Sequence, residues 1–329
     1  MRVGRHMPTH SKMVKAAEIA QQIGCETIQI FASNPTGWRP PADNDEGCAA
    51  FAQAACAYEL DPVVLHAPYL INLGTTDDNI WHKSVSLLTW TMQRGARLGA
   101  KYVVFHTGSH RGAGITVGLA QVAQGIESIL RKSPPTPTDA INRVPTVSPN
   151  KSGGGTRSQV MLLLENDVGA GNSLGHSFEQ LAAILAQLPQ YQDRLGICLD
   201  TAHLWGAGYD ISSRDSTLQV LQNCEDTFGL ARLKVIHLND TAMALGSHRD
   251  VHKRLGEGII GNEGLQTLLR DPRLAHVAVL METPIKTDEH NKEDWTHDTD
   301  QILKAKALMG LRPTPQSPHE FFPSERNTL

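Results

Sequence analysis

Eight short runs rich in Val, Ile and Leu recur along the chain, and most are followed by a stretch with helical patterning. This alternation constrains the fold more than any other feature, because parallel strands buried on both faces need helical crossovers. The runs span Arg2–His6, Thr27–Phe31, Val63–His66, Tyr102–His106, Gln159–Glu165, Leu195–Asp200, Lys234–Leu238 and Val277–Glu282. Eight repeats predict an α/β fold built as a closed (β/α)8 TIM barrel.

A doubly wound open sheet is the alternative fold for such alternation. No G-x-G-x-x-G turn follows the first run, which weakens a dinucleotide-binding interpretation. We expect one catalytic barrel domain over residues 1–310. Residues 133–157 are rich in Pro, Ser, Thr and Gly and predict a long inserted loop, and residues 311–329 predict a Pro-rich, poorly ordered tail.

Composition excludes several classes of protein. The 329 residues contain no run of 18 apolar residues and no apolar segment of signal-peptide type at the start, so we expect no membrane span and a cytoplasmic location. The five cysteines are scattered without a C-x-x-C pair, which indicates reduced thiols. A net charge of −4 argues mildly against a dedicated nucleic-acid binder, although a local basic rim can attract DNA. We expect a monomer.

Metal-capable side chains gather at the ends of the predicted strands. The chain has fifteen histidines, and histidine is the commonest metal ligand. Strand C-termini converge on one face of a (β/α)8 barrel, so residues far apart in sequence would meet there. One such residue alone is more often structural, but burying many without a cation is unfavourable. Seven of the eight runs end on or beside one: His6, His66, His106, Glu165, Asp200, His237 and Glu282.

Two short motifs add further ligands. Asp200-Thr-Ala-His203 places a histidine just beyond a strand end, and Asp250-Val-His252 lets two side chains point the same way from an extended segment. With His6 set aside as a supporting residue, the inventory is five His, two Glu and two Asp, with no thiolate. Such donors suit Zn or Mn at a catalytic site. Nine ligands exceed the need of one ion, and clustered ions favour phosphoryl chemistry.

Seven segments of the chain carry a family resemblance. They are LHAPYLINLG (Leu65–Gly74), FHTGSH (Phe105–His110), LLEND (Leu163–Asp167), CLDTAHLWGAGYD (Cys198–Asp210), IHLND (Ile236–Asp240), RDVHKRLGEGIIG (Arg249–Gly261) and METP (Met281–Pro284). Together they resemble the successive motifs of the endonuclease IV family, which has a xylose-isomerase-like barrel. The resemblance implies a DNA-repair enzyme that hydrolyses the phosphodiester 5′ to an abasic site, leaves a 3′-hydroxyl and trims blocked 3′ ends of duplex DNA.

The resemblance also implies a trinuclear zinc centre, with Mn possible at one position. Glu165 would bridge two ions, and it is the residue we expect to orient the attacking hydroxide. The implied ligand sets are His66, His106 and Glu165 for one ion, Glu165, Asp200, His237 and Glu282 for the second, and His203, Asp250 and His252 for the third.

Candidate DNA contacts follow from the same resemblance. Tyr69 and Leu70 match residues with which the family probes the minor groove, and ordinary loop packing is the alternative. Arg249, Lys253 and Arg254 flank the third ligand set and are candidates to meet phosphates, with a solvated loop as the alternative. An abasic site lacks pairing and stacking, so flipping it out of the duplex costs less than flipping an intact nucleotide.

Two departures from the family pattern stand out. Thr36 lies where the resemblance leads us to expect an inserting arginine, which puts that wedge in doubt. The inserted loop carries Arg143, Lys151 and Arg157, which fit either DNA contacts or an inert linker. Two other functions stay open. A sugar isomerase on this barrel would use one or two ions, and a non-catalytic DNA-damage binder would have lost a ligand, but no ligand is missing.

Overall fold

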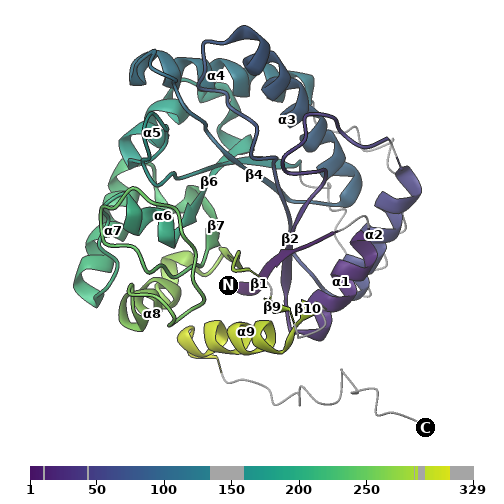
Figure 1. Ribbon diagram of the computed structural model, residues 1–329, viewed down its shortest axis with the longest axis vertical. Helices are drawn as coiled ribbons and strands as arrows, with labels where there is room; N and C mark the ends of the chain where they lie inside the picture. The colour runs from purple at the N-terminus through teal and green to yellow at the C-terminus, as the bar shows by residue number, and fades with distance from the viewer. Residues whose placement is uncertain (10–11, 43, 134–158, 285, 288–292, 312–329) are drawn as a thin grey trace.

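The chain forms a closed barrel of eight parallel strands in a computed structural model that describes residues 1–9, 12–42, 44–133, 159–284, 286–287 and 293–311 (Figure 1). Each strand pairs with the next along the chain, and the last pairs with the first. The closed ring confirms the (β/α)8 prediction and excludes the open doubly wound sheet. The strands are β1 (Arg2–Met7), β2 (Thr27–Phe31), β3 (Val63–His66), β4 (Tyr102–His106), β5 (Met161–Glu165), β6 (Leu195–Asp200), β7 (Leu233–His237) and β8 (Ala278–Met281).

The predicted strand limits are close to those of the structure. β5 begins at Met161, two residues later than predicted, and β7 lies one residue earlier. β8 ends at Met281, so Glu282 follows the strand and does not belong to it. The described part of the predicted insertion is Ser133 alone, and the remainder lies outside the described residues, as does the tail beyond Leu311.

Helices surround the barrel (Figure 1). The α-helices are α1 (Met13–Gln22), α2 (Asp45–Ala57), α3 (Asp78–Leu98), α4 (Ile115–Lys132), α5 (Phe178–Ala186), α6 (Thr201–Gly206), α7 (Arg214–Thr227), α8 (Asn262–Arg270) and α9 (Thr296–Leu308). Short 3-10 helices cover Pro189–Arg194, Leu230–Arg232 and Pro272–Leu274, and β9 (Lys286–Thr287) pairs with β10 (Glu293–Asp294). None of the helices described is long and apolar enough to cross a membrane.

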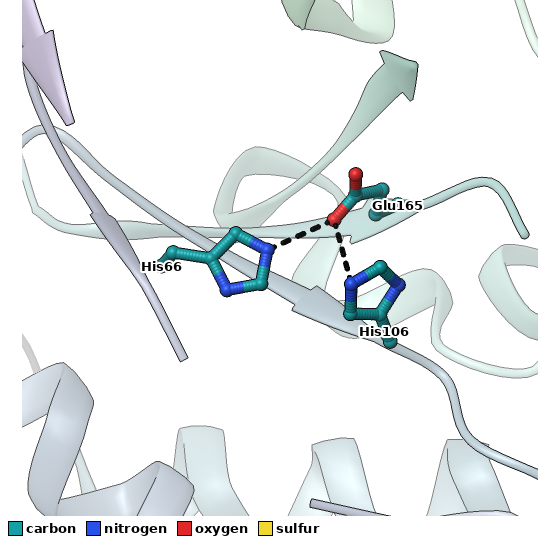
Figure 2. Close-up of side chains that lie close together, drawn as sticks. All are labelled: His66, His106 and Glu165. Atoms are coloured by element: carbon teal, nitrogen blue, oxygen red, sulfur yellow. Dashed lines mark hydrogen bonds and ion pairs between the residues drawn. The ribbon is translucent and has the colours of Figure 1, made fainter. Parts of the chain in front are cut away.

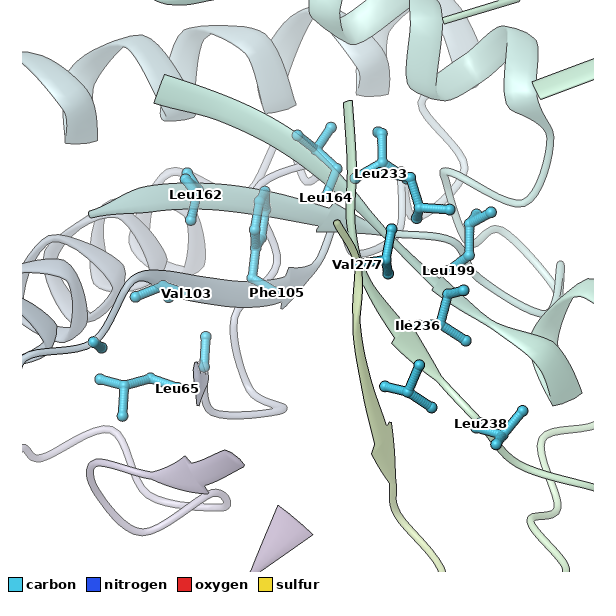
Figure 3. Close-up of a cluster of buried hydrophobic side chains, with 14 of the residues drawn as sticks. Leu65, Val103, Phe105, Leu162, Leu164, Leu199, Leu233, Ile236, Leu238 and Val277 are labelled. Carbon is cyan, nitrogen blue, oxygen red and sulfur yellow. The ribbon is translucent and has the colours of Figure 1, made fainter. Parts of the chain in front are cut away.

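Side chains alternate along each strand, and this places apolar residues in two separate layers. One layer lies between the strands and the helices, where Leu65, Phe105 and Ile236 are buried (Figure 3). The other fills the barrel interior and contains Val64 and Val235, both fully buried. Because successive side chains point to opposite faces, the residue two positions after an interior residue also points inward.

Candidate metal centre

Five predicted ligands occupy inward-facing positions at strand ends, and Glu282 continues the same alternation one residue beyond β8. Each follows, by two residues, an apolar or thiol side chain that fills the barrel interior. All six therefore project into the C-terminal mouth of the barrel, where barrel enzymes build their sites. The interior residue and ligand pairs are Val64 and His66, Val104 and His106, Leu163 and Glu165, Cys198 and Asp200, Val235 and His237, and Leu280 and Glu282.

The inner group consists of His66, His106 and Glu165 from β3, β4 and β5. Figure 2 shows both imidazoles directed at one carboxylate oxygen. His66 Nε2 lies 3.2 Å and His106 Nε2 3.5 Å from Glu165 Oε2. Glu165 and His66 are buried, whereas a quarter of the His106 side chain is exposed. These three donors lie within 4.8 Å of one another, which is close enough to share one ion.

The bridging group consists of Glu165, Asp200, His237 and Glu282. His237 Nδ1 lies 2.7 Å from Glu165 Oε1 and 3.2 Å from Glu282 Oε2. One ligand atom from each of the four residues lies within 4.8 Å of the others. Glu165 therefore turns Oε2 toward the inner group and Oε1 toward the bridging group, an arrangement that lets one carboxylate join two ions.

The outer group consists of Asp200, His203, Asp250 and His252. Asp250 Oδ2 lies 3.4 Å from His203 Nε2, and Asp250 Oδ1 lies 3.1 Å from His252 Nε2. His252 Nε2 is also 3.5 Å from Asp200 Oδ2, so Asp200 faces both the outer and the bridging groups. All nine predicted ligands thus lie in one connected cluster.

Three of the histidines hold their second ring nitrogen against a fixed acceptor. His66 Nδ1 donates to the carbonyl oxygen of Ala67 at 2.7 Å, and His203 Nδ1 donates to that of Asn166 at 2.9 Å. His237 Nε2 donates to the side-chain oxygen of Gln29 at 2.9 Å. Such hydrogen bonds aim the other nitrogen into the cluster, and in the neutral imidazole they leave it free to bind a metal, as is typical of metal-binding histidines.

The charges of the cluster fit divalent cations. Burial opposes ionisation of Glu165, but the neighbouring His106 and His237 outweigh it and hold the pKa of this carboxyl well below its usual range. The pKa of Glu282 is also lowered, because the charge of the neighbouring His237 outweighs the cost of burial. Ionised carboxylates packed this closely repel one another unless cations lie between them. The nine residues supply nitrogen and oxygen donors, and such donors fit zinc.

Cys198 also lies close to the bridging group. Its sulfur is within 4.8 Å of ligand atoms of Glu165 and His237. Burial raises the pKa of this thiol to about 12, so it remains protonated near neutral pH. Its side chain belongs to the layer that fills the barrel interior below the ligands, and the bridging group has four nitrogen and oxygen donors without it, so we keep Cys198 out of the ligand set.

Buried amides support the ligands, and the sequence analysis missed them. Asn239 Nδ2 donates to Asp200 Oδ2 at 2.6 Å, and Asn166 Oδ1 accepts from the backbone N–H of Asp200 at 2.7 Å. Gln29 contacts His6, His237 and Glu282. Each amide is a polar residue in or just after an otherwise apolar run, and this is the signal that would have identified them.

Tyr69, a predicted DNA contact, lies on the rim of the cluster, and the predicted contact Leu70 follows it in the chain. The Tyr69 side chain is exposed over 57% of its surface, and its ring packs edge-on against Phe31 at 5.3 Å and beside His66 at 5.5 Å. Leu70 is half-buried. A cavity of about 750 Å³ opens next to this rim and reaches the cluster at His6 and Glu282.

The predicted basic contacts separate into two kinds. Arg249 and Lys253 are exposed beside the outer group. Arg254 is buried, and its guanidinium donates to the carbonyl oxygen of Pro284 at 2.6 Å, which ties two loops together. Thr36 is exposed, and its backbone N–H donates to Asn34 Oδ1 at 3.0 Å within a tight turn.

Comparisons with known proteins agree on one family. Residues 17–305 match the family described as xylose isomerase-like TIM barrel. A probable endonuclease 4 from Methanoculleus marisnigri is 38% identical over 94% of this chain and 99% of its own length. Another from Halothermothrix orenii is 34% identical over 86% and 94%.

Solved structures give the same result. Endonuclease IV from Thermus thermophilus is 33% identical, with a TM-score of 0.75 over 94% of this chain and 99% of that one. A D-psicose 3-epimerase has a TM-score of 0.66 over 94% of this chain and 100% of that one, but at 14% identity it shares the fold alone. The chain therefore belongs to the endonuclease IV family of DNA-repair nucleases, within the xylose isomerase-like TIM barrels.

Proposed function

We propose that this chain hydrolyses the phosphodiester 5′ to abasic sites in duplex DNA, leaves a 3′-hydroxyl and trims blocked 3′ ends, using three zinc ions. The observation that carries the proposal is the overlap of three donor groups. Glu165 is shared by the inner and bridging groups, and Asp200 is shared by the bridging and outer groups. Manganese at one of the three positions is compatible with the same nitrogen and oxygen donors.

The charge of the cluster supports a count of three. Four carboxylates, Glu165, Asp200, Asp250 and Glu282, converge on it. The charge of three divalent cations would exceed that of the four carboxylates by two, which leaves a positive site for a phosphodiester. Two ions would only neutralise the carboxylates. Since the whole chain carries a net charge of −4, attraction of DNA depends on this local field.

Glu165 has the central role in the proposed chemistry. Zinc bound here would lower the pKa of water and act as a Lewis acid toward the phosphate oxygens. Glu165 is fixed between His66 and His237, at 3.2 and 2.7 Å, so its carboxylate can accept a hydrogen bond from the attacking water and aim it at phosphorus. Asp250 and His252 lie at the exposed side of the cluster, where they would hold an ion that could stabilise the negative charge on the leaving oxygen.

The cavity beside the cluster suits an extrahelical sugar. Its volume of about 750 Å³ is in the range of small-molecule sites, and it is bounded by Phe31, Tyr69 and Glu282. Tyr69 at its rim and the neighbouring Leu70 would probe the minor groove, while Arg249 and Lys253 would meet phosphates. We propose a monomer, because every proposed ligand comes from one chain. Free cysteines, four of the five buried, suit the reducing cytoplasm.

The test is cleavage of a duplex that carries one abasic site. We expect zinc-loaded protein to cut on the 5′ side, a chelator to stop cleavage, and added zinc to restore it. A matched intact duplex is the control for selectivity, and a ketohexose epimerisation assay tests the sugar alternative. Failure of the zinc-loaded protein to cut the abasic duplex would reject the proposal, and binding of that duplex without cleavage would favour the non-catalytic binder.

A further inference from the structure

Gln29 stands out because β2 ends without a metal-capable residue. The other seven predicted runs end on or beside one, whereas β2 presents an amide at the inward-facing position two residues before Phe31. This side chain is fully buried. Its polar atoms contact three residues of the metal centre or its border, namely His6, His237 and Glu282.

Simple hydrogen-bond chemistry fixes the direction of each contact. Glu282 is a carboxylate and can only accept, so the amide nitrogen of Gln29 must face it, and the two atoms lie 2.5 Å apart. The amide oxygen then faces His237 Nε2 at 2.9 Å. Because that oxygen can only accept, His237 must carry its proton on Nε2.

The two contacts of Gln29 determine which atoms His237 and Glu282 turn toward the bridging group. With one proton held on Nε2 by the amide oxygen, His237 Nδ1 is the ring nitrogen that would bind an ion, and it points at Glu165 and Glu282. With Oε1 of Glu282 held by the amide, Oε2 is the oxygen that faces His237 Nδ1, at 3.2 Å. One side chain thus selects a tautomer on one ligand and the free oxygen on another.

His6 holds the amide itself in place. Its Nδ1 lies 3.0 Å from Gln29 Nε2 and can accept the second amide hydrogen. The His6 ring packs against Phe31 with centroids 4.4 Å apart, which fixes the ring. The Gln29 amide therefore has a partner for its oxygen and for both of its hydrogens.

We propose that Gln29 is a positioning residue that presents His237 Nδ1 and Glu282 Oε2 to the ion of the bridging group. This inference rests on the proposed function only in assuming that the bridging group holds zinc. Polar groups that fix metal ligands in this way typically affect metal affinity by ten- to a hundredfold when they are removed.

Two substitutions separate the two roles. Gln29→Met keeps the size of the side chain and removes its hydrogen bonds to His237, Glu282 and His6. We expect about ten- to a hundredfold faster loss of one zinc to a chelator and mixed protonation of the His237 ring nitrogens. Gln29→Glu keeps an acceptor for His237 but places a carboxylate against Glu282. We expect the same loss of zinc with the Nε2-protonated ring retained.

The readouts are zinc bound per chain, the rate of zinc release to a chelator, and the ¹⁵N shifts of the His237 ring. Thr27→Val is the matched control. Thr27 lies on the same strand as Gln29 but away from the cluster, and the substitution removes a buried hydrogen bond from its hydroxyl to the Pro62 carbonyl oxygen. We expect it to keep parental zinc content and release, and circular dichroism checks that every variant is folded.

The outcomes distinguish this inference from the proposed function. One result would overturn the role of Gln29 and leave the proposed function standing. In that result the parental chain binds zinc, and the folded Gln29→Met variant keeps parental zinc release and an unchanged His237 ring. A parental chain that binds no zinc would overturn the proposed function first. A loss in Thr27→Val equal to that in Gln29→Met would reduce the role of Gln29 to general packing.

Discussion

The inner and outer groups are held by different kinds of structure. Glu165 and His66 of the inner group end β5 and β3, and both are buried within the barrel ladder. The outer group takes Asp250 and His252 from the long loop after β7, and the Asp250 side chain is 53% exposed. Residues at strand ends are held in place by the hydrogen-bonded strands of the barrel, whereas residues on a loop depend on contacts made within the loop. We therefore expect the outer ion to exchange more readily.

Asp240 provides that support. Its fully buried carboxylate accepts backbone N–H groups from Thr241, Gly256, Gly258 and Ile260, at 2.8 to 3.1 Å. A Cβ at Gly258 would lie 2.3 Å from Asp240 Oδ1, so this loop position requires glycine. The loop that carries the outer ligands is thus folded around one buried acid.

The largest expected effect comes from the residue that the inner and bridging groups share. Glu165→Gln should lower kcat on an abasic duplex by about three orders of magnitude. A bound cation stabilises the transition state by several kcal/mol, and each ~1.4 kcal/mol lost lowers the rate tenfold. The amide has nearly the same shape, so the melting temperature should remain within a few degrees of the parent. The exposed-helix variant Glu179→Gln is the control. Near-parental turnover of Glu165→Gln would contradict the bridging role.

A smaller and more local loss is expected in the outer group. His252→Ala should remove one zinc per chain and lower kcat by about a hundredfold, while the inner and bridging ions stay bound. His248→Asn is a matched control, since His248 lies in the same loop, contacts the Val168 carbonyl and is not a ligand. Loss of all zinc in His252→Ala would show that the groups are not independent.

The support of the loop can be tested separately from its ligands. Asp240→Asn replaces two accepting oxygens with one oxygen and a donor, which should cost about 1–3 kcal/mol of loop stability. Zinc affinity should fall at the outer position only, as measured by competition with a chelator. Equal weakening at all positions would mean that Asp240 stabilises the whole barrel.

Zinc binding at the outer group can be followed through the protons that it releases. Burial lowers the pKa of His252, but the charge of Asp200 and the hydrogen bond with Asp250 outweigh it and raise the pKa to about 9 in the metal-free chain. In the inner group burial lowers the pKa of His106, whereas burial of His66 is outweighed by its hydrogen bond with Glu165 and the pKa of His66 is raised. Zinc binding at the outer group near pH 7.5 should therefore release protons, and the release should fade above pH 9. Calorimetry in buffers of different ionisation enthalpy measures it, and no release at pH 7.5 would contradict the pairing.

The same pKa shift has a consequence for the stability of the metal-free chain. A histidine whose pKa is raised in the folded state, as in His252, stabilises the fold fully below its unfolded pKa of 6.5. This contribution is lost as the pH rises toward 9. Urea unfolding at pH 6 and pH 9 should show the decrease, and it should be smaller in His252→Ala.

The smallest expected effect is on the rim. Tyr69→Ala should raise KM for the abasic duplex by about tenfold through loss of a base-stacking surface, with zinc content unchanged. Tyr69→Phe, which keeps the ring, should stay near the parent. A change in zinc content with Tyr69→Ala would assign Tyr69 to the support of His66.

The recurring apolar runs predicted the strands and the ligands at the strand ends. The runs ending at His66, His106 and Asp200 match β3, β4 and β6, because a buried parallel strand is marked by its own apolar residues. The supporting contacts were not predictable in this way. Arg254 reaches Pro284 and Gln29 reaches His237, and such pairs depend on how the barrel closes and not on local sequence.

The count of zinc ions bound to the full-length parental protein, measured by native mass spectrometry, tests the central claim most directly. The overlap of the inner, bridging and outer groups predicts three ions per chain, with one lost first as chelator is added. A maximum of one ion at saturating zinc would contradict a shared cluster of nine ligands.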